Sequence, residues 1–195
     1  MLDRSLMLCR ATPDNMDSIV RLIEDRAHWL RTQQTDQWAQ PWPSRAERDK
    51  RILEHIHAEK TWIMKHASMI VATITADPEA DPHWPEPERL NPAVYIHRLV
   101  VSLPFAGVEL GAQLLDWAGR LATGEYGARW LRVNAWTTND RLHAYYSRQG
   151  FEHFGQAVDN GHDPGYPSAA LFQRPANLRT STGPTPFTEA PPDAG

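Results

Sequence analysis

The stretch between residues 94 and 118 constrains the fold of this chain more than any other segment. It reads VYIHRLVVSLPFAGVELGAQLLDWA, an apolar strand followed by a short loop with two glycines and an amphipathic helix. Backbone N–H groups at the start of such a helix point outward beside the positive end of the helix dipole. The stretch therefore predicts an anion-binding site at the loop.

The length and composition of the chain limit the number of domains. Its 195 residues, of which 41% are hydrophobic, suffice for one domain with its own core. We expect this single domain to cover residues 1–174. The remaining segment, PANLRTSTGPTPFTEAPPDAG, is rich in proline and threonine, a composition typical of disorder. Residues 175–195 are therefore predicted to form a disordered C-terminal tail.

Charge and cysteine content argue against several classes of partner. A formal net charge of -4 without clustered lysine and arginine disfavours a nucleic-acid surface. The sequence has no long apolar run of the kind that spans a membrane. A single cysteine, Cys9, excludes an intrachain disulfide and a cysteine metal cluster. We expect a soluble, cytoplasmic protein that binds neither nucleic acid nor membranes.

Hydrophobic periodicity and turn residues predict the order of the remaining elements. Ser44 and Glu47 form a capping box that predicts the start of a helix reaching about residue 59. The segment 77–92 is so rich in proline and charge that we expect a surface loop without regular structure. Other patterns predict strands over 6–11, 61–65, 69–76, 94–101, 130–136, 151–155 and 168–174, and helices over 14–30, from 110 to Gly124, and from Asn139 to Gly150. This order predicts a mixed α/β (α+β) domain with helices on a largely antiparallel sheet.

Residues 94–154 resemble the GNAT-type N-acetyltransferase superfamily in two motifs. The loop AGVELG, Ala106 to Gly111, stands where the family has Arg/Gln-x-x-Gly-x-Gly/Ala, and NDRLHAYYSRQGF, Asn139 to Phe151, is similar to Asn-x-x-Ala-x-x-x-Tyr-x-x-x-Gly-Phe. The element order up to about residue 174 is also similar to that fold. The resemblance implies a GNAT-like acyl-CoA N-acyltransferase fold, with a central, mostly antiparallel sheet flanked by helices.

The loop departs from the family pattern at its most constrained position. Ala106 replaces the usual Arg or Gln, and Glu109 replaces the first glycine. A carboxylate beside a diphosphate repels it unless the side chain turns to solvent. A residue other than glycine is expected to need a φ angle below zero there. Glu109 is therefore expected to influence how tightly the loop binds acetyl-CoA.

The resemblance implies acetyl-CoA as co-substrate and no metal. In the family, backbone amides of the loop hold the pyrophosphate, and pantetheine inserts like an extra strand beside the preceding strand. Carried over to this chain, the cofactor-binding residues are Leu99, Val100, Val101, Ala106, Gly107, Val108, Glu109, Leu110, Gly111, Ala112, Asn139 and Tyr146.

Acetyl transfer requires a base for the amine and an acid for the departing thiolate. By resemblance Tyr146 is the acid, and the alternative is a core aromatic with Tyr145 as the exposed partner. His97 is the candidate base, because its alternation with Tyr95 and Leu99 predicts one strand face beside the cleft and its ordinary pKa suits neutral pH. A histidine paired inside the sheet is the alternative. Glu24 and Asp25, acting through water or merely solvated, are further candidates.

The tryptophans where the first helix runs into the following loop are the candidate acceptor site. In the resembled fold this region forms the acceptor side of the cleft, which implicates Glu24, Trp29, Trp38 and Trp42 as substrate-binding residues. Aromatic walls beside acidic residues suit a cationic or ring-bearing amine. Alternatively, the tryptophans only pack the loop onto the sheet.

The chain is therefore predicted to be an enzyme, an acetyl-CoA-dependent N-acetyltransferase acting on the primary amine of a small molecule by direct attack in a ternary complex. Acetylation of a protein lysine or N-terminus is one alternative. A degenerate, non-catalytic domain that binds acyl-CoA or a partner is the other, motivated by Ala106 and Glu109. The resemblance also implies a possible homodimer. Metal sites at His55 and His57, or at His153, His162 and Asp163, are disfavoured because their spacing is unsuitable.

Overall fold

The computed structural model describes residues 6–159, 161, 163 and 165–191. Its strands are β1 Leu6–Arg10, β2 Thr61–His66, β3 Met69–Asp77, β4 Ala93–Val101, β5 Trp130–Ala135, β6 Glu152–Gln156, β7 Ala170–Pro175 and β8 Phe187–Glu189. Its α-helices are α1 Met16–Thr32, α2 Arg45–His57, α3 Glu86–Arg89, α4 Leu110–Glu125 and α5 Asp140–Arg148. Among these described elements, only α3 and β8 were not predicted. Every described helix is too short or too polar to cross a membrane.

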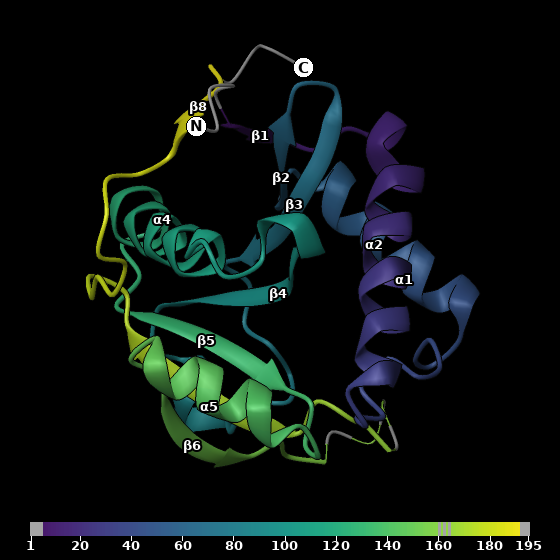
Figure 1. Ribbon diagram of the computed structural model, residues 1–195. Helices are drawn as coiled ribbons and strands as arrows, with labels where there is room; N and C mark the ends of the chain where they lie inside the picture. Colours follow the sequence, from purple (N-terminus) through teal and green to yellow (C-terminus); the bar gives the residue numbers. More distant parts are fainter. Residues whose placement is uncertain (1–5, 160, 162, 164, 192–195) are drawn as a thin grey trace. The chain divides into compact units, whose positions relative to one another are not determined.

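The strands join in one sheet in the order β6-β7-β5-β4-β3-β2-β1-β8 (Figure 1). The pairs β1/β8 and β4/β5 are parallel. The pairs β1/β2, β2/β3, β5/β7 and β6/β7 are antiparallel. A mostly antiparallel sheet with flanking helices confirms the predicted mixed α/β fold.

The described residues divide into two compact units. The first contains the residues up to Thr75, Arg98–Gly111 and the residues from Thr182 onward. The second contains Ala76–His97 and Ala112–Ser181. Each unit has its own cluster of buried apolar side chains.

The core of the first unit lies between two helices and strands of the sheet. Helices α1 and α2 contact each other and run side by side (Figure 1). Ile19 and Ile23 of α1 meet Ile52 and Ile56 of α2 in this core. Helix α2 buries Ile52 and Ile56. At its start the Ser44 hydroxyl accepts a hydrogen bond from the backbone N–H of Glu47 at 3.1 Å, as the predicted cap requires.

In the second unit, the packing of α4 on the backbone after β7 requires glycine at position 119. A β carbon at Gly119 of α4 would lie 2.2 Å from the backbone oxygen of Ala176, which follows β7. Any larger residue at this position therefore has to push the backbone after β7 away from the helix. In the same unit, α5 begins at Asn139, whose side chain accepts a hydrogen bond from the N–H of Leu142.

The segment 77–92 is more ordered than its composition predicts. It contains the short helix α3, and Trp84 within it is fully buried. The indole N–H of Trp84 donates to Oδ1 of Asn134 at 2.7 Å, and the Trp84 ring lies under the guanidinium of Arg132 at 4.5 Å. The prediction of an unstructured surface loop was wrong, because these tertiary contacts of one aromatic residue outweigh local proline content.

The segment after β7 also differs from the predicted disordered tail. Hydrogen bonds from the backbone N–H groups of Thr180 and Ser181 reach the buried carboxylate of Asp116 on α4. Further along, in the first unit, β8 pairs in parallel with β1 and buries Phe187. Composition did not predict the order of this segment, because its contacts are long-range and involve few side chains. Residues 192–195 of the predicted tail lie outside the described residues.

Asp116 is predicted to anchor the C-terminal segment. Its carboxylate also accepts a hydrogen bond from Arg174 at 2.9 Å. Although burial alone raises the pKa of Asp116, hydrogen bonds from Ser181 and Arg174 hold it below its ordinary value. Asp116→Asn should therefore lower the free energy of unfolding at pH 7 by about 2 kcal/mol, because it removes hydrogen bonds to a charged group.

The pH dependence of this effect follows from the lowered pKa of Asp116. The stabilisation is complete above the pKa of Asp116 in the unfolded chain and is lost as the pH falls through its lower pKa in the folded chain. Urea unfolding of both proteins at several pH values measures the difference. Asp25→Asn, which changes an exposed carboxylate on α1, is the control. Equal stability of Asp116→Asn and the parent at pH 7 would contradict the anchoring role.

Candidate functional site

The predicted anion loop lies between the end of β4 and the start of α4, in the first unit. Gly107 and Glu109 both adopt left-handed backbone conformations, with φ angles of 84° and 59°. Left-handed residues in such a turn orient successive backbone N–H groups into a concave anion site. The first N–H groups of α4 also lack intrahelical acceptors and lie at the positive end of its dipole. The geometry of the loop therefore suits a phosphate group.

Glu109 occupies its position differently from the prediction. A negative φ was expected, and this was wrong: the residue takes the left-handed conformation that favours glycine. Its carboxylate accepts a hydrogen bond from the hydroxyl of Thr182 at 2.8 Å and a longer one from the N–H of Thr182 at 3.4 Å. The C-terminal segment thus fixes the direction of the one charged side chain in the loop.

The strand that leads to the loop contains an irregularity. Parallel pairing between β4 and β5 runs from Ala93 opposite Trp130 to Ile96 opposite Val133. Two positions later, Arg98 has a φ angle of 48°, a left-handed residue inside a strand. Such a residue interrupts the alternation of side chains, as at a β-bulge. Because Arg98 stands between His97 and Leu99, the common face of these two residues stays a prediction.

The remaining cofactor-binding candidates are distributed over both units. Val100 is buried in the core of the first unit, so its side chain serves packing. Leu99, Val101 and residues 106–111 belong to the same unit, whereas Ala112, Asn139 and Tyr146 belong to the second. The carboxamide oxygen of Asn139 accepts a hydrogen bond from Leu142 N–H at 3.0 Å. This residue therefore has a structural role at the start of α5.

His97, the candidate base, is half-buried in the second unit beside carboxylates. One of its ring nitrogens lies within 4.8 Å of a carboxylate oxygen of Asp77. Burial tends to raise the pKa of Asp81, but a hydrogen bond from His83 and the nearby charge of His97 lower it overall. A histidine next to anionic groups is suited to accept a proton, and it is equally a paired histidine of the sheet. Both interpretations of His97 remain compatible with its surroundings.

Tyr146, the candidate acid, is buried among aromatic rings of the second unit. Its ring centroid lies 5.4 Å from that of Phe151 and 6.2 Å from that of Phe172. Desolvation raises the pKa of Tyr146, and the neighbouring Tyr145 raises it further. The phenol is therefore protonated at neutral pH, which is the state that a proton donor requires. The residue packs as a core aromatic, and this packing also fixes the position of its hydroxyl group.

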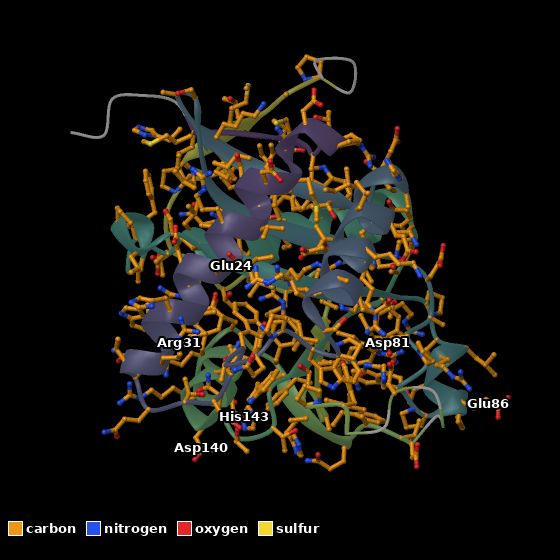
Figure 2. All side chains as sticks on the ribbon, turned by 90° about the vertical axis from the view of Figure 1, so that its right-hand side faces the viewer. Glu24, Arg31, Asp81, Glu86, Asp140 and His143 are labelled. Atoms are coloured by element: carbon orange, nitrogen blue, oxygen red, sulfur yellow. The ribbon has the colours of Figure 1, made fainter. Side chains whose placement is uncertain are left out.

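The acceptor-site candidates all lie in the first unit. Arginines that the sequence analysis did not consider lie beside several of them. Glu24 projects from α1 (Figure 2) and forms ion pairs with Arg45 and Arg48 of α2. Desolvation raises the pKa of Glu24, but the hydrogen bond from Arg48 and the charges of both arginines lower it overall. The Glu24 carboxylate is thus already paired with cations of the protein itself, and its attraction for a cationic amine stays a prediction.

The tryptophans in the same region are also engaged with arginines. The guanidinium carbon of Arg26 lies 4.2 Å from the ring centroid of Trp29, and that of Arg51 lies 5.2 Å from the ring centroid of Trp42. Trp38 packs partly buried against the core of the first unit. Each of these two arginines thus makes a cation–π contact with one of the rings that were predicted to bind a cationic substrate.

The sequence analysis did not identify the buried side chain of His83 in the second unit. His83 donates a hydrogen bond through Nδ1 to a carboxylate oxygen of Asp81 at 2.8 Å. Its Nε2 lies 3.2 Å from Asp163, and its ring stacks on Tyr166 at 3.7 Å. The proline-rich composition of the segment concealed these residues. Asp163 belonged to a disfavoured metal set, of which His162 lies outside the described residues.

Comparison with known proteins identifies relatives over most of the chain. The model of the acetyltransferase (GNAT) family matches residues 24–151, which is more than half of the sequence. A protein of Bacillus subtilis named uncharacterized N-acetyltransferase YesJ is 28% identical over 158 residues, covering 79% of this chain and 86% of the relative.

Solved structures share the fold at lower sequence identity. A GNAT-family acetyltransferase from Listeria monocytogenes has a TM-score of 0.67 with 22% identity, covering 87% of this chain and 94% of its own. The PaiA N-acetyltransferase of Thermoplasma acidophilum, solved in complex with coenzyme A, has a TM-score of 0.65 with 12% identity, covering 88% of this chain and 99% of its own.

Proposed function

The chain belongs to the acetyltransferase (GNAT) family and is an acetyl-CoA-dependent acetyltransferase, and we propose that its acceptor is the primary amine of a small molecule, attacked directly within a ternary complex. The observation that carries the proposal is the loop before α4. Its two left-handed residues and the N–H groups at the start of α4 suit the diphosphate of CoA.

The proposed reaction needs two proton transfers besides the attack. The amine nitrogen forms a bond to the acetyl carbon, and the bond between that carbon and sulfur breaks. In this proposal His97 accepts the proton that the amine loses. Tyr146 protonates the departing thiolate; burial keeps its phenol protonated at neutral pH but, by raising its pKa, also makes it a weaker acid. Backbone N–H groups of the loop at Gly107 to Gly111 hold the diphosphate of acetyl-CoA.

Acetyl-CoA is expected to stabilise the protein against unfolding. At a ligand concentration about 100 times the dissociation constant, mass action contributes about 2.7 kcal/mol. A thermal-shift titration measures this effect, with adenosine as the control ligand because it lacks the diphosphate. Absence of any shift at millimolar acetyl-CoA would contradict the proposal. Binding without release of CoA thiol across a panel of amines, peptides included, would instead identify a non-catalytic domain.

Tyr146→Phe is expected to lower kcat by about a hundredfold, the contribution typical of general acid catalysis. The ring packing is retained, so the dissociation constant of acetyl-CoA should stay nearly the same. Tyr145→Phe is a matched control on the same helix, since burial also raises the pKa of Tyr145, to about 12. CoA-thiol release measures turnover. Equal kcat values for Tyr146→Phe and the parent would remove Tyr146 as the acid.

Glu109→Gly is expected to tighten acetyl-CoA binding, because it removes a negative charge from the loop and suits the left-handed backbone. Thr182→Val should weaken binding, since it frees the Glu109 carboxylate to turn toward the diphosphate. Thr182→Ser keeps the hydroxyl and serves as the control. We expect changes of up to roughly tenfold in Kd, about 1.4 kcal/mol, by isothermal titration calorimetry. Weaker binding by Glu109→Gly would show instead that Glu109 positions the loop.

A further inference from the structure

Arg98 has an unusual backbone conformation for a residue inside a strand. Its φ angle of 48° lies in the left-handed region, although β4 continues to Val101. This conformation is costly for a residue with a side chain. It persists only where surrounding contacts hold it in place. We therefore expect contacts of the Arg98 side chain to maintain the irregularity in β4.

Helix α2 supplies such a contact within the first unit. Nη2 of Arg98 lies 2.9 Å from Nδ1 of His55. Because an arginine side chain only donates hydrogen bonds, Nδ1 accepts this one through its lone pair. In the same unit, Ile52 and Ile56 of α2 share a core with Val100. Helix α2 thus holds β4 at two points, one polar and one apolar.

The hydrogen bond from Arg98 has a competitor at the same nitrogen. Nδ1 of His55 also lies 2.6 Å from the backbone oxygen of Arg51. A carbonyl only accepts, so this second bond requires a proton on Nδ1, whereas the bond from Arg98 requires a lone pair there. The ring therefore has two alternative arrangements, one that holds Arg98 and one that bonds to its own helix. The Arg98–His55 hydrogen bond is thus a latch that the second bond opens.

The latch lies directly before the residues that lead to the anion loop. Leu99 to Val101 complete β4, and the N–H of Ser102 then donates to the backbone oxygen of Val71 at 2.8 Å. The anion loop follows in the same unit. A left-handed residue changes the direction in which the following strand residues point. Arg98 therefore sets the orientation of the strand segment beside the loop.

We propose that His55 is a positioning residue for the acyl donor: through Arg98 it fixes the segment Leu99 to Val101, along which the pantetheine arm of acetyl-CoA lies. The inference rests on the proposed function, in which the diphosphate binds to the loop that follows this segment. It gives α2 a part in cofactor binding, although His55 and Arg98 lie outside both sequence motifs of the family.

The test compares two ligands that differ in the arm. Acetyl-CoA and ADP both carry a diphosphate, but ADP lacks pantetheine. His55→Leu removes the acceptor and keeps a good helix former. It should weaken acetyl-CoA binding about tenfold, the effect of losing one hydrogen bond to a charged group. The Kd of ADP, measured by the same calorimetry, should stay unchanged. His55→Asn places an acceptor oxygen near the position of Nδ1 and should restore most of the affinity.

Two further variants separate the latch from general effects on α2. His57→Leu removes an exposed histidine from the same helix and should leave both Kd values unchanged. Arg98→Gly removes the other partner, suits the left-handed backbone and should weaken acetyl-CoA binding to the level of His55→Leu. The double variant should lose nothing more, because both changes break the same contact. Unchanged acetyl-CoA affinity in His55→Leu, or an equal loss for ADP, would overturn the inference.

Hydrogen exchange of the unliganded protein provides a readout that does not depend on cofactor binding. The amides of Leu99 to Val101 should exchange faster in His55→Leu than in the parent, whereas those of β5 should exchange at the same rate. Faster exchange in a protein that does not bind acetyl-CoA would support the latch and refute only the proposed function. Equal exchange, with acetyl-CoA bound by the parent, would refute only the role of His55.

Discussion

The left-handed backbone at Glu109 is the constraint on which the junction of β4 and α4 depends. The chain must leave a strand and start a helix within a few residues, and Gly107 and Glu109 make that change of direction with positive φ angles. For a residue with a side chain this conformation costs roughly 1 kcal/mol or more. Two hydrogen bonds from Thr182 to the Glu109 carboxylate offset part of that cost. The same bonds turn the negative charge toward the C-terminal segment, so an acidic residue is compatible with the phosphate binding that we propose for this loop.

The C-terminal segment therefore has a function that its composition conceals. In the second unit it satisfies Asp116 through Thr180 and Ser181, and in the first it supplies Thr182 and the strand β8. Asp116 in turn balances the fully buried Arg174.

The fold was largely predictable because local sequence signals mark many of its elements. Ser44, Asn139 and Gly150 mark helix ends, and the two motifs around Ala106–Gly111 and Asn139–Phe151 indicated the family. Trp84 and Phe187 were missed because their burial depends on partners distant in the sequence.

The site was less predictable than the fold. Arg98 has a left-handed φ angle within the strand whose alternation was used to predict the face of His97. Arginine is not a residue type that predicts such an angle. The charges around the acceptor-site candidates could not be predicted from Glu24 and Trp29 alone. It depends on Arg26, Arg45 and Arg48, whose side chains reach them across or along the helices.

The central claim is that the chain transfers an acetyl group from acetyl-CoA directly to an amine. The most direct test measures initial rates of acetylated product by mass spectrometry while the concentrations of acetyl-CoA and of an accepted amine are both varied. Direct attack in a ternary complex predicts double-reciprocal lines that intersect, with one CoA released for each acetylated amine. Parallel lines would indicate an acetylated enzyme, and acetyl-CoA binding without any acetylated product would show that the chain is not an acetyltransferase.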